Sequence, residues 1–145
     1  FTFYTIAPLE KKFKELRNLV DSLSRDGKPL NEISDIRKKI IHLGTDVEIA
    51  KVLQRKVLSI ALQDEVPQTE SAIFKLFSTK LHQKLANNAM DILGREGLFR
   101  KEYKHAHANG KWEWSYRSTL VDTIGAGTTE IQKNTIAKKA LNLPL

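Results

Sequence analysis

The sequence contains no cysteine among its 145 residues. Neither a disulfide framework nor a thiolate metal site is therefore possible within it. No apolar run approaches the roughly 18 consecutive residues that a membrane-spanning helix needs, so we expect no membrane insertion. The lack of cysteine also fits a reducing compartment, and we expect a cytoplasmic protein.

Several signatures of catalysis and nucleotide binding are also missing. The sequence has no G-x-S-x-G nucleophile elbow, no Walker-type phosphate loop and no dinucleotide-binding glycine pattern. No segment alternates convincingly between polar and apolar residues, so we expect no sheet. The length suits a single domain over residues 1–145. Because the chain begins with Phe1 and its only methionine is Met90, we expect it to be a piece of a longer protein.

Positive charge is present in excess and is unevenly distributed. The formal net charge is +7, and residues 73–145 hold 12 Lys+Arg against 6 Asp+Glu. A positive field of this size attracts polyanions such as nucleic acid or nucleotide cofactors. A solvated, lysine-rich surface explains the same numbers, so the charge alone does not decide between these interpretations.

The spacing of apolar residues predicts long helices. We expect helices over residues 8–24, 31–64, 69–93, 115–124 and 128–143, with an irregular loop over residues 98–114. The second of these helices would approach 50 Å, at about 1.5 Å per residue, which suits a helical bundle. The predicted fold is therefore all-α, an antiparallel up-and-down bundle of four to five helices.

The segment TIGAGTTEIQKNTIAKKAL, residues 123–141, places a glycine-rich turn directly before the last predicted helix. Thr129 and Gln132 have the spacing of a capping box, which predicts a helix start here. The backbone amides of residues 127–130, with the hydroxyls of Thr128 and Thr129, could also hold a phosphate. The residues leave both interpretations open.

Histidines offer only weak evidence for a metal site. His105 and His107 form an H-A-H pair in the predicted loop, but no third ligand is evident nearby. We therefore expect them to be exposed and predict no metal. His42 and His82 are isolated in the sequence, and we assign them no role.

Aromatic residues lie among basic ones between residues 100 and 117. Trp112, Trp114 and Tyr116 are spaced two apart, with several lysines and arginines before them. Such aromatic side chains can stack on nucleic-acid bases. We favour a structural role, in which they attach the long loop to the bundle.

Two segments resemble the C-terminal helical domain of the acyl-CoA dehydrogenase family. They are KLANNAMDILGREGLF, at the end of the third predicted helix, and GAGTTEIQKNTIAKKALNL. The similarity covers most of the chain, and its most specific part is GTTEIQKNTIA. Members of that family bind FAD and remove two hydrogens across the α,β carbons of acyl-CoA thioesters.

The resemblance implies two regions of contact with FAD. One is the turn before the last helix, formed by Gly127, Thr128, Thr129 and Glu130. The other is the turn at residues 91–95, which would approach the adenine and diphosphate end of FAD, often from a neighbouring subunit, and for which we predict the contacts Asp91, Gly94 and Arg95.

The sequence departs from the family pattern in two places. Ala126 occupies the position where many members carry the catalytic glutamate, so this segment supplies no base, and we predict no catalytic residue in the chain. The arginine-x-x-phenylalanine-glycine element that usually helps to hold FAD is replaced by SRDGKP. Arg25 and Lys28 are the cations available in that segment, and we assign neither of them to FAD.

We therefore expect the C-terminal domain of an FAD-dependent acyl-CoA dehydrogenase, inactive alone and acting on acyl-CoA only in a longer protein. Its long apolar helix faces predict self-association, as a homodimer, a homotetramer or a hetero-oligomer. One alternative is a non-catalytic partner subunit of a heteromeric dehydrogenase, as Ala126 suggests. The other is a basic helical module that binds acidic partners or nucleic acid, which we consider the weaker hypothesis.

Overall fold

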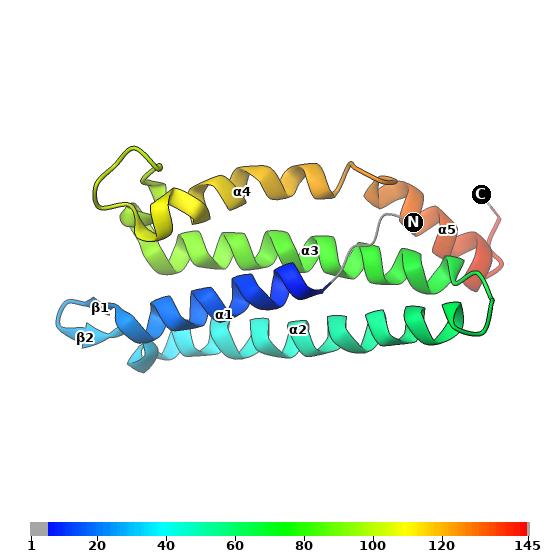
Figure 1. Ribbon diagram of the computed structural model, residues 1–145, viewed down its shortest axis with the longest axis horizontal. Coiled ribbons are helices and arrows are strands. Elements are labelled where there is room, and N and C mark those ends of the chain that lie inside the picture. The colour runs from blue at the N-terminus through cyan, green and yellow to red at the C-terminus, as the bar shows by residue number, and fades with distance from the viewer. Residues whose placement is uncertain (1–5, 145) are drawn as a thin grey trace.

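The computed structural model describes residues 6–144 and shows an elongated bundle of helices (Figure 1). Phe1, from which we expected a piece of a longer protein, lies outside the described residues. The five α-helices are α1 (Ala7–Ser22), α2 (Ser34–Ala61), α3 (Gln68–Leu93), α4 (Lys111–Asp122) and α5 (Thr129–Ala140). Helices α1 to α4 alternate in direction, which confirms the predicted antiparallel all-α bundle.

Prolines and glycines mark the helix boundaries. Pro8 lies in the first turn of α1, where its missing N–H costs no helical hydrogen bond. Pro67 is the N-cap of α3, and Gly94 ends that helix with a φ of 57°. With its 28 residues, α2 is roughly 42 Å long. Both long helices were therefore predicted correctly, with ends within three residues of those observed.

A short hairpin connects α1 to α2. Strands β1 (Ser24–Arg25) and β2 (Lys28–Pro29) pair antiparallel. Asp26 and Gly27 join them with φ values of 52° and 78°, and positive φ at both positions matches the tight turn that a two-residue hairpin loop favours. The expectation of no sheet is wrong for this two-stranded ribbon.

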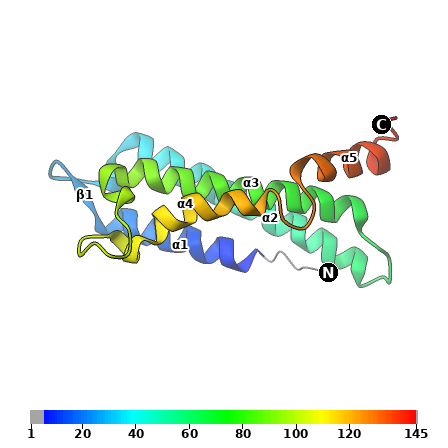
Figure 2. The same cartoon turned by 90° about the horizontal axis from the view of Figure 1, so that it is seen from above.

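Helix α3 is central to the bundle and packs against α2, α4 and α5 (Figure 2). Short 3-10 helices lie at Leu30–Glu32, Gly94–Leu98 and His107–Gly110. Among the described residues, α5 contributes no fully buried side chain. The buried apolar core includes Leu16, Val20, Leu43, Val47, Ala50, Leu81, Leu85, Ala89, Ile92 and Trp112.

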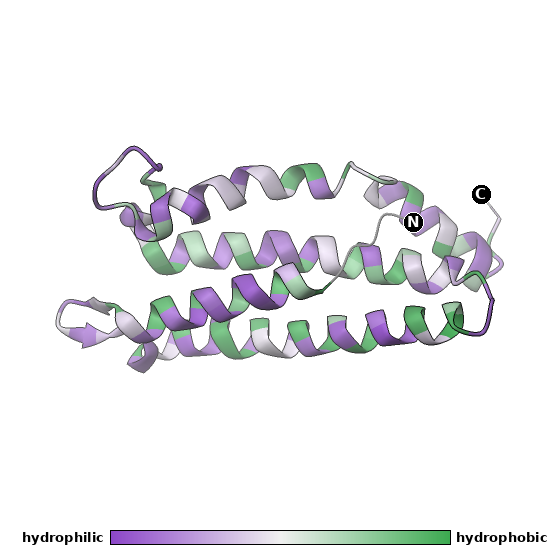
Figure 3. Ribbon diagram, in the orientation of Figure 1, coloured by the Kyte–Doolittle hydropathy of each residue, from purple (hydrophilic) through white to green (hydrophobic). Residues whose placement is uncertain are grey.

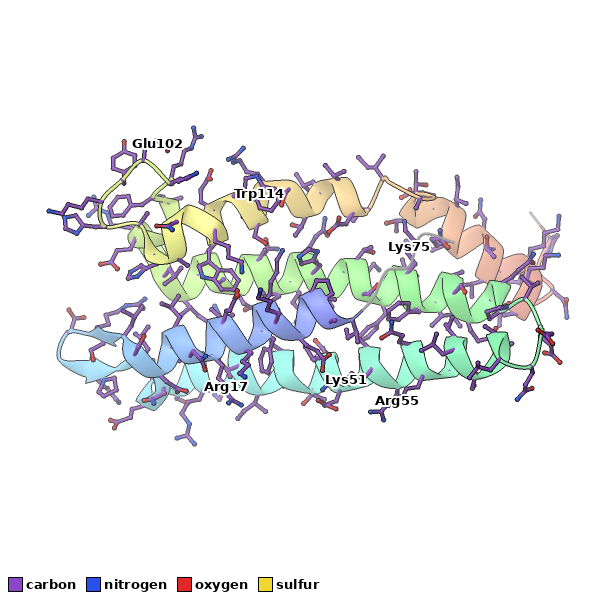
Figure 4. The ribbon with its side chains drawn as sticks, in the orientation of Figure 1. Arg17, Lys51, Arg55, Lys75, Glu102 and Trp114 are labelled. Carbon is purple, nitrogen blue, oxygen red and sulfur yellow. The ribbon has the colours of Figure 1, made fainter. Side chains whose placement is uncertain are left out.

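Helix α4 begins four residues before the predicted start, at Lys111. Trp112 is only 2% exposed, which confirms that it attaches this region to the bundle. Trp114 and Tyr116 are 59% and 49% exposed, so the same prediction is wrong for them. In Figure 4, Trp114 projects from α4.

Apolar side chains also remain on the surface. On α2 they include Ile41, Val52 and Leu58, and apolar residues continue to the far end of that helix (Figure 3). Contact with another protein surface would remove these apolar side chains from water. Among the helices at residues 6–144, none is both long enough and apolar enough to cross a membrane.

Candidate functional site

A pocket of about 470 Å³ lies where the hairpin meets the C-terminal end of α3. Arg25 lines it from the hairpin, and Asp91, Gly94 and Arg95 line it from α3 and the turn that follows. The Arg25 Nη2 group donates a hydrogen bond to the Ile92 carbonyl at 2.5 Å. The structure therefore brings three of the predicted FAD contacts together with the Arg25 guanidinium, to which sequence reasoning assigned no ligand.

Two guanidinium groups and the carboxylates of Asp26, Asp91 and Glu96 line the pocket, and its guanidinium groups could meet an anion. Gly94 has no side chain, and a Cβ built there would lie 3.9 Å from Arg25 Nη2, so this guanidinium borders exposed backbone. Arg95 adds a second cation, and the Asp91 carboxylate is paired with Lys39 at 2.9 Å. Guanidinium groups bind phosphate oxygens well, because their donors form a planar fork.

The second candidate region is the turn between α4 and α5. Thr128 is the N-cap of α5, and its Oγ1 accepts a hydrogen bond from the Ile131 N–H at 3.3 Å. The predicted capping box of Thr129 and Gln132 is therefore wrong, because the cap lies one residue earlier. The prediction of a helix start at this point is confirmed.

Side chains of the bundle hold the carbonyl groups of this turn. Gln132 Nε2 donates to the carbonyls of Ala126 and Gly127, at 3.3 and 3.4 Å. Lys75 Nζ donates to the carbonyls of Gly125, at 2.6 Å, and of Gly127. Sequence reasoning missed Lys75, because nothing in the pattern of α3 indicates a partner 50 residues further along the chain.

A carboxylate lies at the start of α5. Glu130 accepts hydrogen bonds from its own backbone N–H and from the Thr128 hydroxyl, and these bonds lower the pKa of the Glu130 carboxyl. The donors at this helix start therefore favour negative charge, as the helix dipole also does. A ligand oxygen placed here would compete with the Glu130 carboxylate for the same donors.

The two candidate regions lie far apart along α3 (Figure 1). Lys75 contacts the α4–α5 turn, whereas Asp91 lines the pocket beside the hairpin. These two residues are sixteen positions apart in one helix, which corresponds to roughly 24 Å. Within one chain, the structure does not bring the two sets of predicted FAD contacts together.

A polar network links α1, α3 and α4. Lys12 Nζ donates to His82 Nε2 and, at 2.9 Å, to Ser115 Oγ, while His82 Nδ1 donates to Asp122 Oδ2 at 2.5 Å. Sequence reasoning assigned no role to His82, whose partners are far away in the chain. Because Ser115 has no exposed surface, it cannot meet a substrate, and we interpret the network as structural.

Stability should depend on pH through His82. Burial and the Lys12 ammonium lower its pKa, and together they outweigh the hydrogen bond to Asp122. Below about pH 6.5 the unfolded chain takes up a proton that the folded chain resists, so folded stability is lost as pH falls. We expect the free energy of unfolding to fall as the pH drops below about 6.5, by at most roughly 1.4 kcal/mol per pH unit.

Urea denaturation at a series of pH values measures this dependence. The control is His82→Gln, which cannot titrate and should lose stability less steeply over the same interval. Equal slopes for the two proteins would show that His82 is not the group responsible.

Basic residues around the α4 N-terminus are largely engaged by carboxylates. Arg117 donates to Glu113 at 2.6 and 3.0 Å, Arg100 lies 3.5 Å from the same carboxylate, and Lys111 pairs with Glu15. The Arg117 hydrogen bonds are the main reason that the pKa of Glu113 is lowered. Ion pairing of these side chains weakens the case for a dedicated nucleic-acid surface here.

The two histidines of the H-A-H pair lie in different surroundings. His107 Nε2 contacts the Glu96 carboxylate, whereas His105 is exposed. Within residues 6–144, no group of three or more histidine and acidic side chains is arranged to hold a metal ion. His42 is exposed on α2.

Comparisons with a family model and with a known protein indicate the same family. Residues 2–141 match the family model described as "Acyl-CoA dehydrogenase, C-terminal domain". Acyl-CoA dehydrogenase IpdE1 of Mycobacterium tuberculosis is 30% identical over 136 residues, which cover 90% of this chain and 32% of that protein. This chain therefore spans about a third of the length of that relative.

Solved structures share the fold at lower identity. The crystal structure of the ChsE4–ChsE5 complex from Mycobacterium tuberculosis superposes with a TM-score of 0.89 at 23% identity, covering 99% of this chain and 38% of that one. An FAD complex of PigA superposes with a TM-score of 0.81 at 16% identity, covering 93% and 33% of the two chains. Similarity at this level of identity establishes the fold.

Proposed function

Since this chain belongs to the acyl-CoA dehydrogenase family as a C-terminal domain, we propose that it is the helical part of an FAD-dependent enzyme that oxidises acyl-CoA thioesters. FAD, when bound, supplies the acceptor for the hydride removed from the substrate. The domain contributes contacts to FAD and surfaces for subunit packing, and it is inactive alone. A cytoplasmic location is part of the same proposal.

The observation that carries the proposal is the pocket between the hairpin and the end of α3. The Arg25 guanidinium lies beside the exposed backbone of Gly94, and Arg95 lines the same pocket. This arrangement suits the diphosphate of FAD. Although the sequence departs from the usual arginine-containing element before α2, the Arg25 guanidinium is held in the pocket by the Ile92 carbonyl. We assign Arg25 as the residue that takes the place of the arginine in that element.

The separation of the two candidate regions supports a flavin site shared between subunits. The pocket and the α4–α5 turn are separated by roughly 24 Å along α3. One subunit would therefore offer its turn, with Gly127, Thr128, Thr129 and Glu130, to one FAD and its pocket to another. The exposed apolar side chains of α2 and α4 supply surface for such packing. The ChsE4–ChsE5 complex shows that a protein of this fold assembles with a second component.

Replacing Arg25 with glutamine in the full-length protein should weaken FAD binding. Loss of a charged donor to phosphate typically costs about 1.5–3 kcal/mol, so the dissociation constant should rise roughly ten- to a hundredfold. Flavin fluorescence during titration of the apoprotein measures the change. Arg17→Gln is the matched control, because Arg17 is exposed on α1 and lies outside the pocket (Figure 4). Equal affinity in the two variants would refute the assignment of Arg25.

A second candidate is the non-catalytic subunit of a heteromeric dehydrogenase. Ala126 is exposed on the turn, and its side chain is a methyl group, which cannot accept a proton. In a longer protein, a glutamate on a helix outside this domain would support an active subunit. The corresponding experiment compares dehydrogenase activity of the purified full-length protein alone and with its partner subunit. Activity without a partner would exclude the non-catalytic role.

A further inference from the structure

Lys75 is a lysine placed where lysines are seldom found. It lies in the first half of α3, and only 7% of its surface is exposed. The neighbouring residues Phe74, Ser78 and Thr79 are also buried. Figure 4 shows Lys75 on α3 beside the connection between α4 and α5. Burial of this kind disfavours an ammonium group unless acceptors satisfy it.

Two acceptors of Lys75 are main-chain carbonyls of the turn. Its Nζ donates to Gly125 O at 2.6 Å and to Gly127 O. Burial lowers the pKa of the Lys75 ammonium, and the charge of Asp122 opposes this effect. Hydrogen bonds from a charged donor are stronger than those between neutral groups, so these two bonds should hold the turn firmly.

The direction of these carbonyls determines the direction of the amides. In a trans peptide the C=O and N–H groups point in opposite directions. Drawing the carbonyls of Gly125 and Gly127 toward Lys75 therefore directs the N–H groups of Ala126 and Thr128 away from the bundle. Gln132 Nε2 also donates to the Gly127 carbonyl, which supports this orientation, and to the Ala126 carbonyl.

The turn needs such support, because its backbone is strained. Ala126 has a φ of 54°, a conformation that non-glycine residues avoid and that persists only when the surroundings enforce it. The Thr129 N–H closes the turn with a bond to Thr123 O at 3.1 Å, and the Gly125 N–H bonds to Val121 O at 2.9 Å. Both hydrogen bonds form only when residues 125–129 keep this turn conformation.

We infer that Lys75 is a positioning residue, which fixes the turn at residues 125–128 so that the N–H groups of Ala126 and Thr128 face outward for a ligand. Only the identity of that ligand rests on the proposed function. The geometric part concerns this chain alone and can be tested without FAD.

The test compares Lys75→Met with Lys80→Met. Both substitutions remove a lysine from α3, but Lys80 is exposed, whereas Lys75 is buried and donates to the turn. Hydrogen exchange of individual amides, followed by nuclear magnetic resonance, reports on the Thr129 bond. In Lys75→Met, exchange at Thr129 should become about tenfold faster or more, as expected on losing charged hydrogen bonds. Lys80→Met should leave it unchanged.

A chemical rescue separates positioning from general stability. The chain contains no cysteine, so Lys75→Cys introduces a unique thiol. Alkylation of that thiol with 2-bromoethylamine restores an ammonium group on a side chain of nearly the same length as lysine. Slow exchange at Thr129 should return after alkylation, while the α3 amides near Leu85 exchange at the same rate in every variant.

Two outcomes would overturn the inference. One is equal Thr129 exchange in Lys75→Met and Lys80→Met. The other is a uniform rise across α3 in Lys75→Met, which would indicate a general packing role. Failure of the full-length wild-type protein to bind FAD would count against the proposed function, and the exchange result would stand independently of it.

Discussion

Replacing Trp112 with alanine should lower the free energy of unfolding by about 3–5 kcal/mol. The indole is only 2% exposed and belongs to the apolar core between α4 and the rest of the bundle. Alanine would leave a cavity that well-packed neighbours cannot fill completely. Urea denaturation followed by far-ultraviolet circular dichroism measures the loss without relying on tryptophan fluorescence.

Trp114→Ala provides the matched control. It removes the same side chain from the same helix, two positions away, where 59% of the residue is exposed. Its effect should lie within about 0.5 kcal/mol of zero. Similar losses in both variants would mean that the burial of Trp112 does not explain its contribution.

Substituting Gly110 with alanine should cost at least about 2 kcal/mol, because strain and close approach act together. Its φ is 68°, and a Cβ built there would lie 2.6 Å from the Lys101 nitrogen and 2.7 Å from the Arg100 carbonyl carbon. Those atoms are backbone and cannot rotate away. The same denaturation experiment measures the loss, and residues 100–111 should become more susceptible to proteolysis.

Gly27→Ala separates the two causes. Gly27 also has a positive φ, of 78°, but a Cβ added to it would meet no other atom within 4 Å. The expected cost is about 1 kcal/mol, from the backbone conformation alone. If Gly110→Ala were no more destabilising than Gly27→Ala, the close approach to Arg100 and Lys101 would have no energetic effect.

The long helices could be predicted because their apolar residues repeat at helical spacing over many turns. Helix α4 is less regular, and its start was predicted four residues late. Its first turn contains Lys111, Trp112 and Glu113, and the sequence around it resembles that of a polar loop. Gly110, at the N-cap of α4 with a left-handed conformation, gives that boundary its physical basis.

Two local features of the sequence allow more than one structure. Asp26–Gly27 indicates a helix stop, but this dipeptide also favours a tight hairpin turn, and the chain forms one. Thr128 and Thr129 can both cap a helix, and local spacing favours the second. Gln132 bonds instead to the carbonyls of the preceding turn, so the cap lies one residue earlier.

The contacts of Lys75, His82 and Arg25 could not be predicted from sequence spacing. Each depends on packing between segments that are distant in the chain, such as the 67 residues between Arg25 and Ile92. A lysine within an apolar helix face indicates that the side chain needs a polar partner, but the sequence pattern does not identify that partner. The family resemblance correctly indicated the fold, but it does not reveal these tertiary contacts.

Helix α5, which begins at the α4–α5 turn, has no fully buried residue among those described. Segments with few buried contacts open locally at a small cost in free energy. A ligand seated at this turn would therefore reduce the motion of α5, and the lost entropy would offset part of the binding free energy. Ligand binding would then be detectable as reduced mobility of α5, even if the average structure of the bundle did not change.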